Sequence, residues 1–261
     1  MTFVPTATVP SRRPPDEDRV AVDLTDVAVR YRVPHEEINT FKEFAIRVVQ
    51  RRMEYRDFWA LAGVSLAIGR GEAHAIVGRN GAGKSTLLRL VARVLHPTRG
   101  RVRVIGRVAP LLEIGAGFHP ELTGRENVVL NATLLGRSKR EALARFDEII
   151  SFAEIEDFVD APLRTYSSGM AARLGFAVAT AWPADVLIVD ELLSVGDESF
   201  SAKSAARIDE FRQAGASILF VSHNLPLVEA TCDRASWLEH GRLQASGQTA
   251  EVLAAYRSAF A

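Results

Sequence analysis

Residues 73–86 read AHAIVGRNGAGKST, and this stretch decides how the rest of the sequence is interpreted. Residues 73–77 form a short apolar run, which predicts a fully buried strand of a parallel sheet. Residues 78–86 fit the pattern G-x-x-x-x-G-K-[ST], and residues 85–94 have the spacing of a helix. A strand, a glycine-rich loop and a helix in this order predict an α/β fold with a phosphate site after the strand.

The residue types within this loop are those that a chain of phosphates requires. Gly78, Gly81 and Gly83 allow backbone conformations in which successive N–H groups point inward. We expect Lys84 to place its ammonium group between the terminal phosphates, and the Ser85 hydroxyl to ligate Mg²⁺. A glycine-rich turn without a ligand is the alternative, and the flanking strand and helix weigh against it. The predicted nucleotide-binding residues are Gly78, Arg79, Asn80, Gly81, Ala82, Gly83, Lys84, Ser85 and Thr86.

Two further apolar runs end in polar residues. The run at 186–189 precedes Asp190 and Glu191, and the run at 217–221 is followed closely by His223. The carboxyl ends of parallel strands meet at one edge of a sheet, so we expect these residues near the phosphate loop. Asp190 is suited to bind Mg²⁺, Glu191 to polarise the attacking water and His223 to contact the γ-phosphate. The predicted catalytic residues are Glu191, His223 and Lys84. For His223 the alternative is a solvated loop residue, which is common after a strand.

The segment 166–170, YSSGM, precedes a helix-like stretch and has two readings. Locally it is a helix start capped by Ser167 or Ser168. Functionally it is a second helix N-terminus, where Ser168 and Gly169 offer a hydroxyl and N–H groups to phosphate.

The composition is that of an ordinary globular protein. The chain has 261 residues, 48% of them hydrophobic, and 32 basic side chains balance 32 acidic ones. A neutral chain lacks the basic field that non-specific nucleic-acid binders use. No stretch reaches the roughly 18 to 20 apolar residues that a membrane span requires. The single thiol, Cys232, fits a reducing compartment.

The chain divides into a tail and one α/β domain. Residues 1–19 are rich in proline and predict a disordered tail, and residues 20–261 form the domain. Residues 20–31 and 59–68 alternate apolar and polar side chains, which predicts a small antiparallel β region near the N-terminus. Residues 121–181 carry helical patterning and predict a helical subdomain.

Residues 34–56 separate the two alternating segments and differ from both. Thr40 and Glu43 have the spacing of a capping box, and apolar residues recur on one helical face. We therefore predict an amphipathic helical insert.

With these motifs in this order, the sequence resembles the ATP-binding subunit of an ABC transporter over about residues 20–255. The resemblance implies a P-loop ABC-ATPase core that binds ATP and Mg²⁺ and hydrolyses ATP. It also implies a head-to-tail homodimer, in which Ser168 and Gly169 of one copy face the phosphate loop of the other. An integral membrane permease is the implied partner, nucleic acid is not, and the implied location is peripheral, on the cytoplasmic face of the inner membrane.

Three departures from the usual pattern of this family resemble one branch of it. Residues 166–170 read YSSGM rather than L-S-G-G-Q, and LLSVGD follows Glu191 where P-T-S-A-L-D is usual. The loop that normally carries a glutamine offers Glu113 as its best candidate, a further expected ligand of nucleotide or Mg²⁺. The branch exports lipid-linked polysaccharides such as O-antigen, teichoic acid and mycobacterial galactan, so export of such a polymer is the expected function.

The insert over residues 34–56 also resembles that branch, whose members carry a helix near the membrane. Its arginines are expected to contact anionic headgroups or the pyrophosphate of the lipid carrier, and a solvated charged helix face is an equal alternative. The residues concerned are Arg47, Arg51, Arg52 and Arg56. The aromatic side chain that stacks on adenine is Tyr31, Tyr55 or Trp59, and the insert leaves all three open.

Three other functions compete with polysaccharide export. A soluble ABC ATPase acting on ribosomes or DNA is disfavoured by the neutral charge and by the single phosphate loop. A P-loop kinase would not need Ser168 and Gly169. An ABC ATPase for another substrate keeps every motif, and because the sequence ends soon after His223 we expect substrate choice to lie in the permease.

Overall fold

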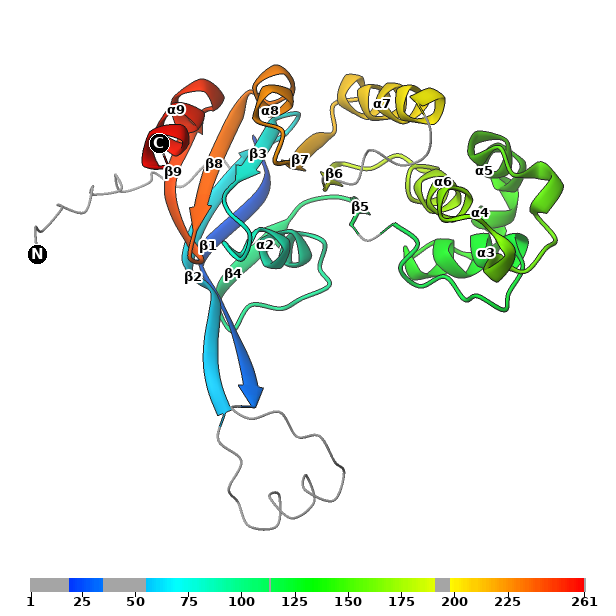
Figure 1. Cartoon of the computed structure of the whole chain (residues 1–261), viewed down its shortest axis with the longest axis horizontal. Helices are drawn as coiled ribbons and strands as arrows, with labels where there is room; N and C mark the ends of the chain where they lie inside the picture. The colour runs from blue at the N-terminus through cyan, green and yellow to red at the C-terminus, as the bar shows by residue number, and fades with distance from the viewer. Residues whose placement is uncertain (1–18, 35–54, 113, 191–197, 261) are drawn as a thin grey trace, which may run out of the picture.

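The centre of the protein is a six-stranded sheet in the order β5-β6-β7-β3-β8-β9 (Figure 1). The computed structural model describes residues 19–34, 55–112, 114–190 and 198–260. The sheet strands other than β9 run parallel, and β9 pairs antiparallel with β8 at the edge. The three apolar runs of the sequence are buried strands, as predicted. In sheet order the strands are β5 (Val108–Leu111), β6 (Val186–Val189), β7 (Ser217–Val221), β3 (Ala73–Val77), β8 (Arg234–Glu239) and β9 (Arg242–Gln248).

A three-stranded antiparallel sheet packs beside the first. Its order is β2-β1-β4, with β1 at Val20–Pro34, β2 at Tyr55–Gly69 and β4 at Arg99–Val104. This confirms the predicted antiparallel β region, to which β4 contributes from later in the chain. In Figure 1 the far ends of β1 and β2 extend from the body as a two-stranded ribbon.

Helices and the small sheet cover the two faces of the six-stranded sheet. On one face, α2 (Lys84–Val91) and strands β1 and β2 share a buried core with the inward side chains of β3, β6 and β7. On the other face lie α7 (Glu198–Gln213), α8 (Leu225–Thr231) and α9 (Thr249–Ala259). Burial on both faces fixes the strands, and with them the loops that follow the strands.

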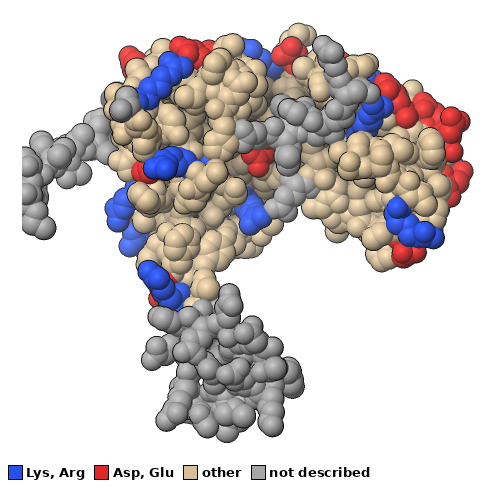
Figure 2. Space-filling view, viewed as in Figure 1, with Lys and Arg blue, Asp and Glu red and all other residues tan. Residues whose placement is uncertain are grey.

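A group of helices stands to one side of the sheets. It contains α3 (Gly124–Leu134), α4 (Lys139–Ala144), α5 (Phe146–Ala153) and α6 (Ser168–Ala179), with a core of its own. Capping boxes start α3 at Thr123 and α4 at Ser138. Figure 2 shows acidic side chains gathered on the outer edge of this helical subdomain. In the part of the chain that the structure describes, no helix is both long and apolar enough to cross a bilayer.

A buried aromatic joint connects the helical subdomain with the main body. The rings of Phe152 in α5, Phe176 in α6 and Phe200 in α7 lie 5.8 to 5.9 Å apart, centroid to centroid. Lys203 of α7 adds a polar contact, because its Nζ donates to the carbonyl oxygen of Phe152 at 2.9 Å and to Glu154 Oε1 at 2.9 Å. Helix α7 is thus packed onto α5 and α6, not merely linked to them by the chain.

The ends of the predicted insert are strand, not helix. Pro34 pairs with Tyr55 and Val33 with Arg56 in the β1–β2 ladder, so the expectation of a helix over residues 34–56 is wrong at these margins. Both strands thus extend beyond the alternating segments at 20–31 and 59–68. Residues 35–54 lie outside the described residues, as does the expected tail except Arg19.

A polar network around the buried His74 lies at the end of the sheet remote from the phosphate loop. His74 Nδ1 lies 2.7 Å from Glu72 Oε1, and His74 Nε2 lies 2.8 Å from Ser236 Oγ. Burial raises the pKa of Glu72, but hydrogen bonds from His74 and the Gly69 N–H, with the charges of His74 and Arg234, outweigh it. The pKa of Glu72 therefore lies below its ordinary value.

The single cysteine is part of the core. Cys232 is 6% exposed and packs among the side chains that α8 and α9 bury against the sheet. Burial, helped by the charge of Asp233 and opposed by Arg212, raises the pKa of the Cys232 thiol to about 12. A neutral, buried thiol of this kind packs as a small apolar side chain and is not a nucleophile.

Candidate nucleotide site

The loop between β3 and α2 has the backbone geometry of a phosphate cradle. Gly78, Gly81 and Gly83 have φ values of 153°, 78° and 107°, which L side chains rarely adopt. A Cβ on Gly78 would clash with the carbonyl oxygen of Leu238, and a Cβ on Gly83 with that of Ala60. Glycine is therefore needed at these two positions for both conformation and space.

Lys84 forms hydrogen bonds across the phosphate loop. Its Nζ donates to the carbonyl oxygen of Gly78 at 2.7 Å and to that of Arg79 at 3.0 Å, and the residue is only 9% exposed. The ammonium group is thus held over the loop, where terminal phosphates would bind. Ser85, in the first turn of α2, is exposed. The roles of the two side chains toward phosphate and Mg²⁺ stay predictions.

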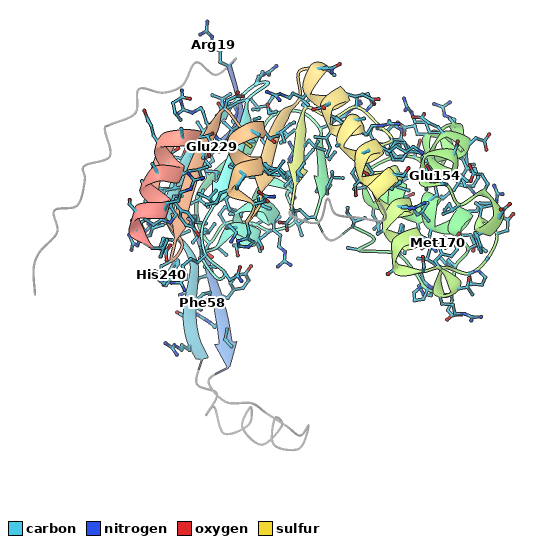
Figure 3. The ribbon with its side chains drawn as sticks, turned by 45° about the horizontal axis from the view of Figure 1, so that its top comes forward. Arg19, Phe58, Glu154, Met170, Glu229 and His240 are labelled. Carbon is cyan, nitrogen blue, oxygen red and sulfur yellow. The ribbon has the colours of Figure 1, made fainter. Side chains whose placement is uncertain are left out.

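The turn between β8 and β9 supports the loop from behind. The Gly241 N–H donates to the Ala82 carbonyl oxygen at 2.9 Å, and the Ala62 N–H donates to the Gly241 carbonyl oxygen at 2.8 Å. Hydrogen bonds therefore connect β2, the β8–β9 turn and the phosphate loop. In Figure 3, His240 and Phe58 lie at the end of the body from which the ribbon extends.

The other predicted site segments follow neighbouring strands. Asp190 comes directly after β6, and His223 follows β7 with one residue between them. Since β7 lies between β6 and β3, all three segments meet at one edge of the parallel sheet. Asp190 is half-exposed and His223 is exposed, so neither is sealed in the core. Glu191 and Glu113 lie outside the described residues.

The oxygen donors at this edge suit Mg²⁺. The hydroxyl of Ser85 and the carboxylate of Asp190 are hard oxygen ligands, and Mg²⁺ uses one or two such protein ligands together with phosphates and water. Within the described residues, no three His, Cys, Asp or Glu side chains gather to bind a metal without such help. The donor set therefore fits an ion bound together with nucleotide.

The start of α6 shows which serine of residues 166–170 caps the helix. The Oγ of Ser167 accepts the N–H of Met170 at 3.1 Å, so Ser167 is the cap, and Ser168 is the exposed first residue of the helix. Figure 3 places Met170 in the helical subdomain, far from the His240 turn behind the phosphate loop. One chain therefore does not bring Ser168 and Gly169 to its own phosphate loop.

The candidate adenine-stacking residues differ in their surroundings. Tyr31 packs partly against the core, whereas Trp59 is 46% exposed and has the Arg30 guanidinium 5.7 Å from its ring centroid. Trp59 also precedes Ala60, whose carbonyl oxygen abuts Gly83. The side chain of Tyr55 lies outside the described residues.

A phosphate loop on a mainly parallel sheet, with a small antiparallel sheet and a helical subdomain, defines an ATP-binding cassette. The family model for ABC transporters matches residues 61–194. The O-antigen export ATP-binding protein RfbB of Klebsiella pneumoniae is 52% identical over 206 residues, which cover 79% of this chain and 84% of that protein. The chain belongs to the ABC transporter family and is an ATP-binding subunit of the ABC ATPase type.

Other relatives are longer than the shared region. An RfbB protein of Myxococcus xanthus is 46% identical over 93% of this chain, which spans 57% of that relative's length. The teichoic acids export ATP-binding protein TagH of Enterococcus faecalis is 44% identical over 77% of this chain and 45% of its own length. Among solved structures, a dimeric ATP-binding cassette bound to ADP and Pi has a TM-score of 0.67 at 22% identity, covering 87% of this chain and 98% of its own. That likeness concerns the fold.

The sequence did not point to the supporting turn behind the loop. The signal that could have located it is the alternation in polarity of residues 234–239 and 242–248 around His240 and Gly241, which is typical of a hairpin. The exposed Phe58, 54% accessible beside Trp59, was likewise not among the aromatic candidates.

Proposed function

We propose that this chain is the ATP-hydrolysing subunit of a transporter that exports a lipid-linked polysaccharide across the cytoplasmic membrane. The observation that carries the proposal is the formed phosphate loop at the same sheet edge as Asp190 and His223. Relatives named as O-antigen and teichoic acid exporters, at 44 to 52% identity, support the choice of substrate class. The cytoplasmic face of the membrane, beside a permease, is the proposed location.

The proposed roles follow the geometry. Lys84 neutralises the β- and γ-phosphates, the loop N–H groups bind their oxygens, and Trp59 stacks on adenine. Ser85 and Asp190 would hold Mg²⁺, which supplies positive charge against the phosphates. Glu191 orients the attacking water, and His223 contacts the γ-phosphate. Glu113 remains a proposed further ligand.

A second copy of the chain completes each site. Ser168 and Gly169 begin α6, and Ser168 is exposed at this end of the helix, which lies far from the phosphate loop of the same chain. Two copies arranged head to tail would set this helix N-terminus, with its free hydroxyl and N–H groups, against the γ-phosphate bound by the partner. Such a requirement also separates the proposal from a P-loop kinase, for which Ser168 would be dispensable.

The central test replaces Glu191 with Gln. Glu191→Gln should keep ATP binding, lose most turnover and accumulate an ATP-bound dimer, as measured by ATPase assay and light scattering. The control is Glu229→Gln on α8, where an exposed carboxylate pairs with Arg257 away from the loop. Turnover in Glu191→Gln equal to that of the control would contradict the proposed role.

The transport function requires its own test. The chain is co-expressed with a candidate permease, purified in lipid vesicles and assayed for ATPase activity with and without polyprenyl-linked polysaccharide. We expect the polymer to stimulate turnover, and an unrelated transport substrate to have no effect. An activity that the polymer leaves unchanged in every pairing would favour an ABC ATPase for another substrate.

Lipid contact by the insert is a separate part of the proposal. Changing Arg47, Arg51, Arg52 and Arg56 to Ser should reduce co-sedimentation with vesicles that contain anionic lipid, because each basic residue near such a surface contributes about 1 kcal/mol. The matched control changes four exposed arginines elsewhere: Arg70, Arg101, Arg140 and Arg242. Equal losses in both variants, or none in either, would remove the lipid role.

A further inference from the structure

Three aromatic side chains form a cluster where the last helix meets the sheet. Trp237 of β8, Tyr256 of α9 and Phe260 just after α9 contact one another edge to face. Their ring centroids are 5.7 Å apart for Trp237 and Tyr256, 6.0 Å for Trp237 and Phe260, and 5.2 Å for Tyr256 and Phe260. Such pairs favour one geometry, so the cluster fixes the position of the Phe260 ring.

The Phe260 ring contacts the phosphate loop through Arg79. The guanidinium carbon of Arg79 lies 5.3 Å from the Phe260 ring centroid, within the range of a cation–π contact. Arg79 is exposed, and among the described residues it forms no ion pair. Phe260 is thus the side chain that restrains this cation, while the backbone carbonyl of Arg79 accepts from Lys84.

Two backbone contacts also join the β8–β9 hairpin to the phosphate loop. The Leu238 carbonyl oxygen packs so closely on Gly78 that no Cβ fits between them, and the Gly241 N–H donates to the Ala82 carbonyl oxygen. The contacts of Leu238 and Gly241 involve backbone atoms, whereas the contact between Arg79 and Phe260 depends on side chains alone. It is therefore the contact that a substitution can remove without disturbing the backbone of the loop.

We propose that Phe260 is a positioning residue for the nucleotide site, which restrains Arg79 beside the phosphate loop before ATP binds. The inference rests on the proposed function, because it presumes that the loop binds ATP. A free arginine side chain loses rotamer freedom when it is ordered by a ligand, and a side chain that is already restrained loses less. Phe260 thereby raises the affinity for nucleotide without touching the nucleotide.

The expected size of the effect follows from the contact. A cation–π contact at a partly exposed site corresponds to about a two- to fivefold change in an equilibrium constant. Phe260→Leu, which keeps bulk but loses the ring, should weaken ATP binding by about this factor. Phe260→Tyr keeps the ring and should restore the affinity of the original chain.

The experiment is a double-mutant cycle on the whole chain, with ATP affinity measured by calorimetry in Glu191→Gln to prevent turnover. Arg79→Gln and Phe260→Leu should each weaken binding, and the double variant should be no weaker than the Arg79→Gln variant. Phe158→Leu is the control, since Phe158 is 48% exposed, similar to the 46% of Phe260, but lies in the helical subdomain. Melting temperatures are recorded for every variant.

Several results would overturn the inference. Unchanged or tighter binding by Phe260→Leu, additive effects in the double variant, or a failure of Phe260→Tyr to restore affinity would each refute the positioning role. Should Phe260→Leu lower the melting temperature, the comparison of Arg79→Gln with Arg79→Lys, which keeps the cation, still decides: equal affinities would refute the role. If the parent chain itself fails to bind ATP, the proposed function fails instead.

Discussion

The phosphate loop should be highly sensitive to a single methyl group at Gly83. Gly83 has φ 107°, and a Cβ there would lie 2.5 Å from the Ala60 carbonyl oxygen and 2.9 Å from Leu61 Cδ2. The backbone conformation alone costs an L residue about 1–3 kcal/mol, and the contact with a strand carbonyl must be relieved by moving the loop or β2. We therefore expect Gly83→Ala to lose at least about 2 kcal/mol of unfolding free energy, or roughly 4–8 °C in melting temperature.

The matched control for this substitution is Gly215→Ala. Gly215 has φ 85° but no atom within 4 Å of an added Cβ, so its variant measures the conformational cost without the contact. Thermal unfolding by circular dichroism gives the stabilities, and calorimetry gives ATP affinity. Gly83→Ala should be the less stable and should lose ATP binding, while Gly215→Ala keeps it. Equal stability of the two variants, with ATP binding intact in both, would refute the argument that the loop needs glycine at residue 83.

Three smaller predictions concern single side chains. Cys232 should resist a thiol reagent at pH 8 in the folded chain and react fully in denaturant, because burial raises the pKa of its thiol to about 12; rapid labelling of the folded chain would contradict this. Because the pKa of Glu72 is lowered by folding, its stabilisation is complete above the ordinary value of 4.5 and lost as pH falls through the folded value. In urea titrations the difference in unfolding free energy between the parent and Glu72→Gln should therefore stay constant from pH 7 down to about pH 5 and shrink as the pH falls below 4.5, and a difference that stays constant below pH 4.5 as well would exclude the linkage. Ser167→Ala should cost about 1 kcal/mol of stability through the lost cap, whereas Ser168→Ala should cost little stability but reduce ATPase activity; the reverse order would mean that the two serines are wrongly assigned.

The sequence identified those elements whose pattern is continuous along the chain. The apolar runs at 73–77, 186–189 and 217–221 agree with β3, β6 and β7 in both limits, because strands buried on both faces need apolar side chains throughout. The glycine pattern of residues 78–86 located the phosphate loop for a similar reason, since both the positive φ values and the close contacts admit only glycine. Local requirements of this kind can be predicted from a single sequence.

Elements that depend on distant partners were harder to predict. β4 and the β8–β9 hairpin went unassigned, although β4 joins β1 and the hairpin turn supports the phosphate loop. The sequence left Ser167 and Ser168 open as the cap of α6, because both are good cap residues and only the geometry distinguishes them. The contact between Arg79 and Phe260 joins residues that are far apart in the sequence, and no local pattern predicts it.

The aromatic joint among Phe152, Phe176 and Phe200 has a mechanical consequence. Helix α7 begins shortly after the carboxylates that follow β6, and α6 begins at Ser168, the residue proposed to meet a partner's nucleotide. Close-packed rings transmit displacement because an interior without voids resists compression. A tilt of α7 that kept the rings in contact would therefore tilt α6 as well, and a structural change next to Asp190 would displace the surface that is proposed to meet a second copy.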